Sequence, residues 1–120
     1  MSRTAHRIAT VEELREDGDR VIEEIAGQEI AVYCLDGELY AIANYCTHQG
    51  GPLCEGPTTG RLRTDEDGET LEYDDTESVV RCPWHGWRFE IPSGRSLQSD
   101  RWSVPTYDVE VRDGAVYVLR

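Results

Sequence analysis

Lysine is absent from this chain: all twelve basic residues are arginines, against 24 aspartates and glutamates. The formal net charge of −12 describes a surface that repels nucleic acid and anionic membranes, so we expect neither as a partner. The acidic residues are spread over the whole chain. This spread favours adaptation to a high-salt cytoplasm over a docking field for a basic partner, although the charge by itself fits both.

Long apolar runs are also missing. No stretch reaches the roughly 18 apolar residues of a membrane span, and the first thirty residues alternate charged and apolar positions. These features argue against a transmembrane helix and a signal peptide, and they predict a soluble, cytoplasmic protein. A length of 120 residues predicts one domain with its own core.

Histidine and cysteine are scarce, with three and four residues, and four of these seven residues form two short pairs. One residue separates Cys46 from His48, and two residues separate Cys82 from His85. Because nothing indicates secretion, this spacing points to metal binding more than to disulfides. Two thiolates and two imidazoles fit a tetrahedral zinc site or a [2Fe–2S] cluster with two histidine ligands, and spacing alone leaves both open.

The segments that flank the two pairs have the pattern of antiparallel strands. Residues 20–45 are rich in β-branched and aromatic residues around the turn dipeptide Asp36-Gly37. Residues 106–120 repeat this pattern around Asp113-Gly114. Both ends of the chain are therefore expected to belong to one antiparallel sheet assembly.

The middle of the chain has a different composition. Residues 44–95 are rich in glycine and proline and contain both Cys/His pairs. Within them, residues 61–78 hold eight carboxylates and an Asp-Glu-Asp-Gly turn sequence, which predicts an exposed inserted hairpin or loop. Near the N-terminus, Thr10 and Glu13 form a capping-box pattern that predicts a short helix ending before Gly18.

The residues around the two pairs carry a family resemblance. The stretches CTHQGGPL, at residues 46–53, and CPWHGWRF, at residues 82–89, together resemble the two loops of the Rieske iron–sulfur family, and in particular its ferredoxin branch. The resemblance implies one [2Fe–2S] cluster, whose inner iron is bound by two thiolates and whose outer iron is bound by two imidazoles near the surface. The implied ligands are Cys46, Cys82, His48 and His85.

The resemblance also assigns a task to the residues beside the ligands. Glycines and prolines let both loops fold tightly and turn backbone N–H groups toward the cluster, while the tryptophans limit the access of water. The residues implied in this supporting layer are Gly50, Gly51, Pro52, Pro83, Trp84, Gly86 and Trp87.

Four positions depart from the Rieske proteins of respiratory complexes. Those proteins carry an extra cysteine in each loop, where this chain has Gly51 and Trp84, so no clamping disulfide can form. They also place a serine and a tyrosine hydroxyl where this chain has Trp87 and Phe89. The loss of both hydroxyl donors predicts a reduction potential near the low end of the family's range of roughly −150 to +300 mV.

The implied architecture is all-β, with a single Rieske domain over residues 1–120. An antiparallel β-sandwich or incomplete barrel forms the base from residues 4–43 and 96–120. Residues 44–95 form a small cluster-binding part that includes the acidic insertion at about 61–78. Trp102 and Tyr107 are expected to pack in the core, as is Cys34, whereas Cys54 is expected to be a loop thiol without a function.

The implied function is one-electron transfer from a reductase, expected to contain flavin, to a terminal oxygenase or a similar redox enzyme. A complete Rieske oxygenase also needs a mononuclear iron site with two further histidines, and this chain has only one left over. The chain is therefore expected to be an electron-transfer component and not an enzyme by itself. The alternatives are a small subunit of a larger redox enzyme, such as assimilatory nitrite reductase, and a structural zinc-binding module.

Overall fold

The computed structural model describes residues 3–46, 51–64, 71–84, 86–99 and 101–120, and it gives only the backbone of residues 61–64, 71, 72, 74 and 75. The described chain is all-β, as predicted, with two antiparallel sheets and two single turns of 3-10 helix. The six-stranded sheet has the order β1-β9-β8-β4-β3-β2, and the three-stranded sheet has the order β5-β6-β7. The strands are β1 (Ala5–Thr10), β2 (Arg20–Ile25), β3 (Gln28–Leu35), β4 (Glu38–Ala43), β5 (Thr58–Thr64), β6 (Leu71–Arg81), β7 (Arg88–Glu90), β8 (Thr106–Arg112) and β9 (Ala115–Leu119).

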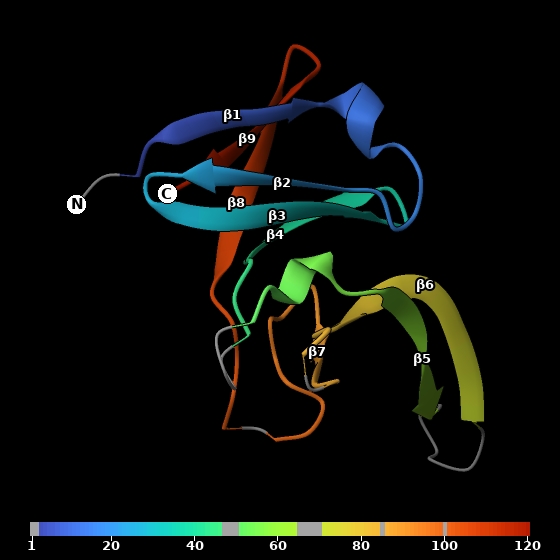
Figure 1. Cartoon of the computed structure of the whole chain (residues 1–120). Helices are drawn as coiled ribbons and strands as arrows, with labels where there is room; N and C mark the ends of the chain where they lie inside the picture. Colours follow the sequence, from blue (N-terminus) through green and yellow to red (C-terminus); the bar gives the residue numbers. More distant parts are fainter. Residues whose placement is uncertain (1–2, 47–50, 65–70, 85, 100) are drawn as a thin grey trace.

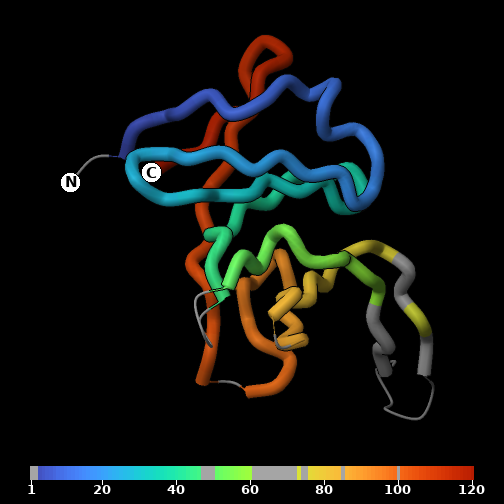
Figure 2. The backbone as a smooth tube through the Cα atoms, viewed as in Figure 1, coloured from blue at the N-terminus to red at the C-terminus, as the bar shows by residue number. Residues whose placement is uncertain are grey.

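The six-stranded sheet curls into a nearly closed barrel. Its two outermost strands, β1 and β2, come close to each other, and the sheet forms the upper part of the molecule in Figure 1. The three-stranded sheet and the loops beside it lie below, and Figure 2 shows that the chain passes between the two parts near residues 44 and 104. Among the described residues, no helix has the length and apolarity needed to cross a membrane.

Three tight turns join neighbouring strands of the barrel. The β3–β4 turn places Asp36 and Gly37 at φ angles of 50° and 83°, and the β8–β9 turn places Asp113 and Gly114 at 49° and 77°. Two successive residues with positive φ match the right-handed twist of the strands they join. The hairpins predicted from these two dipeptides are therefore confirmed.

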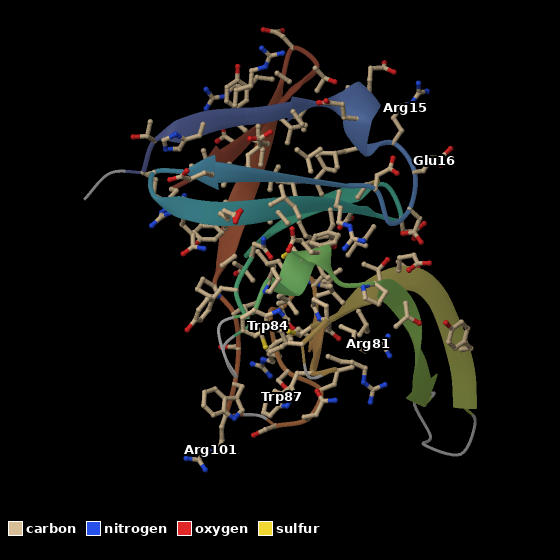
Figure 3. All side chains as sticks on the ribbon, in the orientation of Figure 1. Arg15, Glu16, Arg81, Trp84, Trp87 and Arg101 are labelled. Carbon is tan, nitrogen blue, oxygen red and sulfur yellow. The ribbon has the colours of Figure 1, made fainter. Side chains whose placement is uncertain are left out.

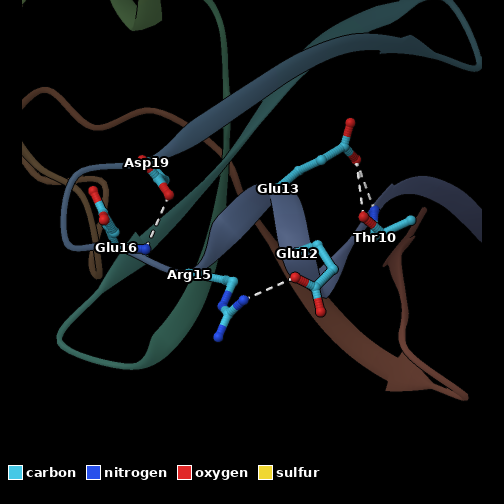
Figure 4. Close-up of polar contacts among 6 residues, drawn as sticks. All are labelled: Thr10, Glu12, Glu13, Arg15, Glu16 and Asp19. Atoms are coloured by element: carbon cyan, nitrogen blue, oxygen red, sulfur yellow. Dashed lines mark hydrogen bonds and ion pairs between the residues drawn. The ribbon is translucent and has the colours of Figure 1, made fainter.

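The predicted short helix is a single 3-10 turn, η1 (Val11–Leu14). The Glu13 carboxylate accepts a hydrogen bond of 2.8 Å from the backbone N–H of Thr10, as a capping box requires (Figure 4). After η1, the Asp19 carboxylate accepts a hydrogen bond of 2.9 Å from the backbone N–H of Glu16 and closes the turn before β2 (Figure 4).

Strand β3 is buried on both faces and separates two hydrophobic clusters. Ile30 and Val32 enter the cluster that fills the barrel. Ala31 and Tyr33 enter the cluster that lies between the barrel and the second sheet. This double burial explains the continuous apolar run of β3, because neither face of the strand meets water.

The three residues predicted to pack in the core have different surroundings. Cys34 is buried in the barrel cluster as predicted, and Tyr107 is half-buried against it. The prediction for Trp102 is wrong, because its side chain is 40% exposed and lies against Trp87 instead of between the sheets. The segment that carries Trp102 runs beside the second sheet, outside the barrel.

Candidate cluster-binding site

Two loops at the lower end of the molecule carry the residues predicted to bind the cluster. Loop 1 (residues 44–57) leads from β4 to β5, and loop 2 (residues 82–87) leads from β6 to β7. His48, Gly50 and His85 lie outside the described residues, and no group of three or more possible metal ligands occurs within the part that the structure describes. The described part of the candidate site therefore consists of the two cysteines and the loop residues around them.

Both cysteines lie at the inner end of their loops. Cys46 is 2% exposed and Cys82 is 1% exposed, and both belong to the hydrophobic cluster between the two sheets. In each loop the backbone N–H of the cysteine bonds a carbonyl five residues further along the chain. The Cys46 N–H donates to the Gly51 carbonyl at 2.8 Å, and the Cys82 N–H donates to the Trp87 carbonyl at 2.7 Å.

A tight turn shapes loop 2 next to its cysteine. The Gly86 N–H donates to the Cys82 carbonyl at 2.9 Å, and Gly86 has a φ of 74°, which residues with side chains rarely adopt. This turn brings Gly86 back to Cys82, the first residue of loop 2.

The two loops touch each other where glycines leave room. A Cβ on Gly51 would lie 2.8 Å from the Trp84 indole, so the tryptophan of loop 2 rests on the backbone of loop 1. A Cβ on Gly56 would lie only 1.7 Å from the carbonyl oxygen of Arg81, the residue before Cys82. Gly51 and Trp84 occupy the two positions where the respiratory Rieske proteins would have their extra cysteines. In this chain an aromatic contact therefore joins the loops at that place.

Three residues outside the predicted site fasten loop 1 to the barrel. Arg20 of β2 donates hydrogen bonds of 2.7 Å and 2.5 Å to the carbonyls of Cys54 and Gly56. The Tyr33 hydroxyl donates to the same Cys54 carbonyl at 3.4 Å, and the Cys54 N–H donates to the Asn44 side chain at 2.7 Å. Sequence reasoning missed Arg20, Tyr33 and Asn44. The charge of Arg20 was no signal, because β2 also carries the exposed charged residues Glu23 and Glu24.

Cys54 lies in loop 1 as predicted, but it is a core residue of the molecule and not merely a tolerated thiol. Cys54 lies in the second 3-10 turn, η2 (Leu53–Glu55), and its side chain is fully buried in the cluster that also holds Cys46 and Cys82. Its thiol donates a weak hydrogen bond to the Ala43 carbonyl at 3.6 Å. Burial raises the pKa of the Cys54 thiol to about 12, because the thiolate would lose its hydration.

Two tryptophans, Trp84 and Trp87, lie at the lower end of the site. Trp84 is 57% exposed, and Trp87 is half-buried with its ring edge-to-face against Trp102 at a centroid distance of 6.1 Å. Figure 3 shows Trp84 and Trp87 together at this end, below the barrel.

The described residues fit an iron–sulfur cluster. Thiolates are the ligands that such clusters prefer, and both cysteines lie among apolar side chains that exclude water. The glycines at the contact between the loops allow a compact backbone around the cysteines.

A small antiparallel β fold that presents two cysteine-bearing loops at one end defines a metal-cluster domain. The chain belongs to the Rieske [2Fe-2S] domain family, whose model matches residues 4–108. Its cofactor is one Rieske-type [2Fe–2S] cluster, and this assignment replaces the zinc alternative.

Relatives of the chain are ferredoxins of oxygenase systems. The ferredoxin component of the naphthalene 1,2-dioxygenase/salicylate 5-hydroxylase systems of Ralstonia sp. is 30% identical over 98 residues, which cover 81% of this chain and 78% of the relative. The 3-phenylpropionate/cinnamic acid dioxygenase ferredoxin subunit of Photorhabdus laumondii is 30% identical over 112 residues, covering 92% and 90%. The solved structure of the Sphingomonas yanoikuyae B1 ferredoxin is similar with a TM-score of 0.71 at 27% identity, covering 98% of this chain and 99% of that chain. The predicted resemblance to the ferredoxin branch is confirmed.

Proposed function

We propose that this protein is a one-electron carrier that receives electrons from a flavin-containing reductase and passes them to a terminal oxygenase or a similar redox enzyme. The observation that carries the proposal is the pair of buried cysteines, Cys46 and Cys82, on two loops that meet at one end of the fold. The names of the relatives support it, since they are ferredoxin components of dioxygenase systems. The cytoplasmic location stays a prediction.

We propose the ligand set and the domain division on the same basis. Cys46 and Cys82 supply the thiolates, and His48 and His85 supply the imidazoles. When bound, the cluster supplies a site that is reduced and reoxidised by one electron. A single domain contains the base (4–43 and 96–120) and the cluster-binding part (44–95).

The protein's own residues control the surroundings of the cluster. The apolar side chains around Cys46 and Cys82 exclude water from the inner side of the loops. The hydrogen bonds from Arg20 and Tyr33 keep loop 1 against the rigid barrel, so the loops keep their geometry while the charge of the site changes. A rigid protein environment lowers the reorganisation energy of each electron transfer.

Electron paramagnetic resonance of the dithionite-reduced, anaerobically purified protein tests this proposal, together with iron and sulfide analysis. We expect two irons and two sulfides per chain and a spectrum of mixed nitrogen and sulfur ligation. Cys82→Ser should abolish the signal, whereas Cys34→Ser, in the barrel core, should keep it. A colourless protein that contains zinc would contradict the proposal.

A second measurement separates a shuttling carrier from a fixed subunit. The protein is added in increasing substoichiometric amounts to the reductase of a naphthalene dioxygenase system, with cytochrome c as the final electron acceptor. A carrier supports many turnovers per molecule, because it dissociates after each transfer. Activity that appears only at a fixed stoichiometric ratio would favour the subunit alternative.

A further inference from the structure

We propose that the cluster-binding end of the molecule is a cationic, aromatic docking surface that fits a redox partner with an acidic contact surface. The cationic and aromatic residues of this surface are Tyr45, Arg81, Trp84, Arg88, Arg101 and Trp102. This inference rests on the proposed function, because the partner is the protein that exchanges electrons with the cluster. It differs from the docking field for a basic partner that the net charge of the whole chain would also fit.

The charges of the chain are unevenly distributed. Residues 79–103, which contain loop 2 and the segment that returns to the barrel, hold four arginines and only two acidic residues. The rest of the chain holds eight arginines and 22 acidic residues. The segment that contains a proposed ligand pair is therefore locally positive within a strongly negative protein.

Two of these arginines face each other across adjacent strands. Arg81 at the end of β6 pairs with Arg88 at the start of β7, and both side chains are exposed. Like charges at directly opposite positions of an antiparallel pair destabilise a sheet. Three exposed arginines elsewhere in the described chain have carboxylate partners: Arg3 contacts Asp108, Arg15 contacts Glu12 and Arg112 contacts Glu110. The pairing of Arg81 with Arg88 lowers the stability of the sheet. It is therefore consistent with a functional need for positive charge beside loop 2.

The Arg81 side chain reaches loop 2. Its Cδ atom lies 3.9 Å from the position that a Cβ on Gly86 would occupy. Figure 3 shows Arg81 and Arg101 at the same end of the molecule as Trp84 and Trp87, whereas Arg15 lies at the other end. The positive charges therefore border the loops proposed to hold the cluster.

Exposed aromatic side chains complete the surface. Of the five large hydrophobic side chains that are exposed among the described residues, three lie at this end: Tyr45 (47%), Trp84 (57%) and Trp102 (40%). Tyrosine, tryptophan and arginine are the residues most enriched among those that dominate binding energy at protein interfaces. The combination fits a protein partner better than it fits a small molecule.

Salt screening allows the local charge to control docking. At physiological ionic strength the Debye length is about 8 Å, whereas the molecule is 44 Å long. Acidic groups on the barrel are therefore largely screened from a partner that touches the loops. The acidic residues of β6 begin at Glu77, four residues before Arg81, which is about 13 Å along a strand and also more than one Debye length. The arginines beside the contact remain effective, so complementarity there requires acidic groups on the partner.

Electron transfer to two forms of one acceptor tests this inference. The reduced protein is mixed with cytochrome c and with succinylated cytochrome c, whose surface lysines carry carboxylates, at an ionic strength of about 0.15 M. The measured quantity is the ratio of the rate constant for the acidic acceptor to that for the basic one. In this ratio, a change in the potential of the cluster cancels to first order. We expect Arg81→Glu/Arg101→Glu to lower the ratio by about fivefold or more.

The control is Arg7→Glu/Arg112→Glu, which changes the net charge equally at exposed positions of β1 and β8, in the barrel. This control should change the ratio less than about twofold. If the double variant at the loops loses its visible spectrum, the single variant Arg101→Glu, outside both loops, replaces it. Equal effects of both double variants would overturn the docking surface and leave the electron-carrier function standing. A wild-type protein without a Rieske signal would overturn the proposed function and this inference with it.

Discussion

Gly56 of loop 1 lies against the backbone of Arg81, the residue before loop 2. Its φ of −77° suits any residue, so conformational freedom is not the reason for glycine there. The reason is space, because a Cβ would lie 1.7 Å from the Arg81 carbonyl oxygen. We predict that Gly56→Ala lowers the free energy of unfolding by about 3 kcal/mol and reduces cluster content. Denaturant titration and visible absorbance per chain measure the two effects.

Gly27→Ala is the matched control for this prediction. Gly27 has a φ of 89°, but nothing lies within 4 Å of the position its Cβ would take. Its substitution adds backbone strain without a collision, so it should cost about 1 kcal/mol and keep the cluster. Similar losses of cluster in both variants would show that contact between the loops is not the cause.

Cys54 should make stability depend on alkaline pH. Burial raises the pKa of its thiol from 9.0 to about 12 in the folded protein. The unfolded chain therefore releases this proton at lower pH than the folded chain does. The stabilisation is complete below about pH 9 and disappears progressively as the pH rises toward 12.

Cys54→Ala removes the titrating thiol and keeps Tyr33, whose pKa is raised by burial and further by Cys54. We predict that the wild type loses more unfolding free energy than Cys54→Ala between pH 8 and pH 10.5. Denaturant titrations at both pH values provide the comparison. Parallel losses in the two proteins would contradict a protonated, buried Cys54.

At the scale of the elements, strand β2 holds loop 1 through a single side chain. The Arg20 guanidinium bonds two carbonyls of loop 1 and lies 5.8 Å from the centre of the Tyr33 ring. We predict that Arg20→Met, which keeps the apolar stem, destabilises the protein by about 2 kcal/mol through the loss of charged hydrogen bonds. Amide hydrogen exchange should accelerate in η2 more than in the barrel strands.

Arg7→Met on β1 removes a charge at an exposed position of the barrel and is the control. It should leave exchange in η2 unchanged. Uniform acceleration over the whole chain in Arg20→Met would mean that Arg20 stabilises the barrel and does not hold the loop in particular.

At the scale of the whole molecule, the charge of −12 destabilises the compact state by self-repulsion. We predict that raising potassium chloride from 0.1 M to about 1 M increases the thermal midpoint by about 5 °C, because salt screens this repulsion. Calorimetry of the cluster-containing protein measures the midpoint. A midpoint that stays constant or falls with salt would count against adaptation of the surface to a high-salt cytoplasm.

Many features of the fold could be predicted because they depend on residues that are close together in the sequence. The dipeptides Asp36-Gly37 and Asp113-Gly114 specify their turns through the backbone angles that these residues tolerate. The loop motifs around Cys46 and Cys82 identify the family because several specific residues occur at fixed spacings. Patterns of this kind can be interpreted without knowing how the strands and loops pack together.

The remainder was decided by contacts between residues that are distant in the chain. Cys54 is a core residue because η2 packs under the barrel, and Arg20 supports the site because β2 passes above loop 1. Gly56 meets Arg81, and Trp102 meets Trp87, across separate segments. The sequence by itself determined the turns and strands of the barrel hairpins and the family of the two loops. Only the tertiary structure decided which side chains support the loops and which stay exposed beside them, because burial and contact depend on how the two sheets pack together.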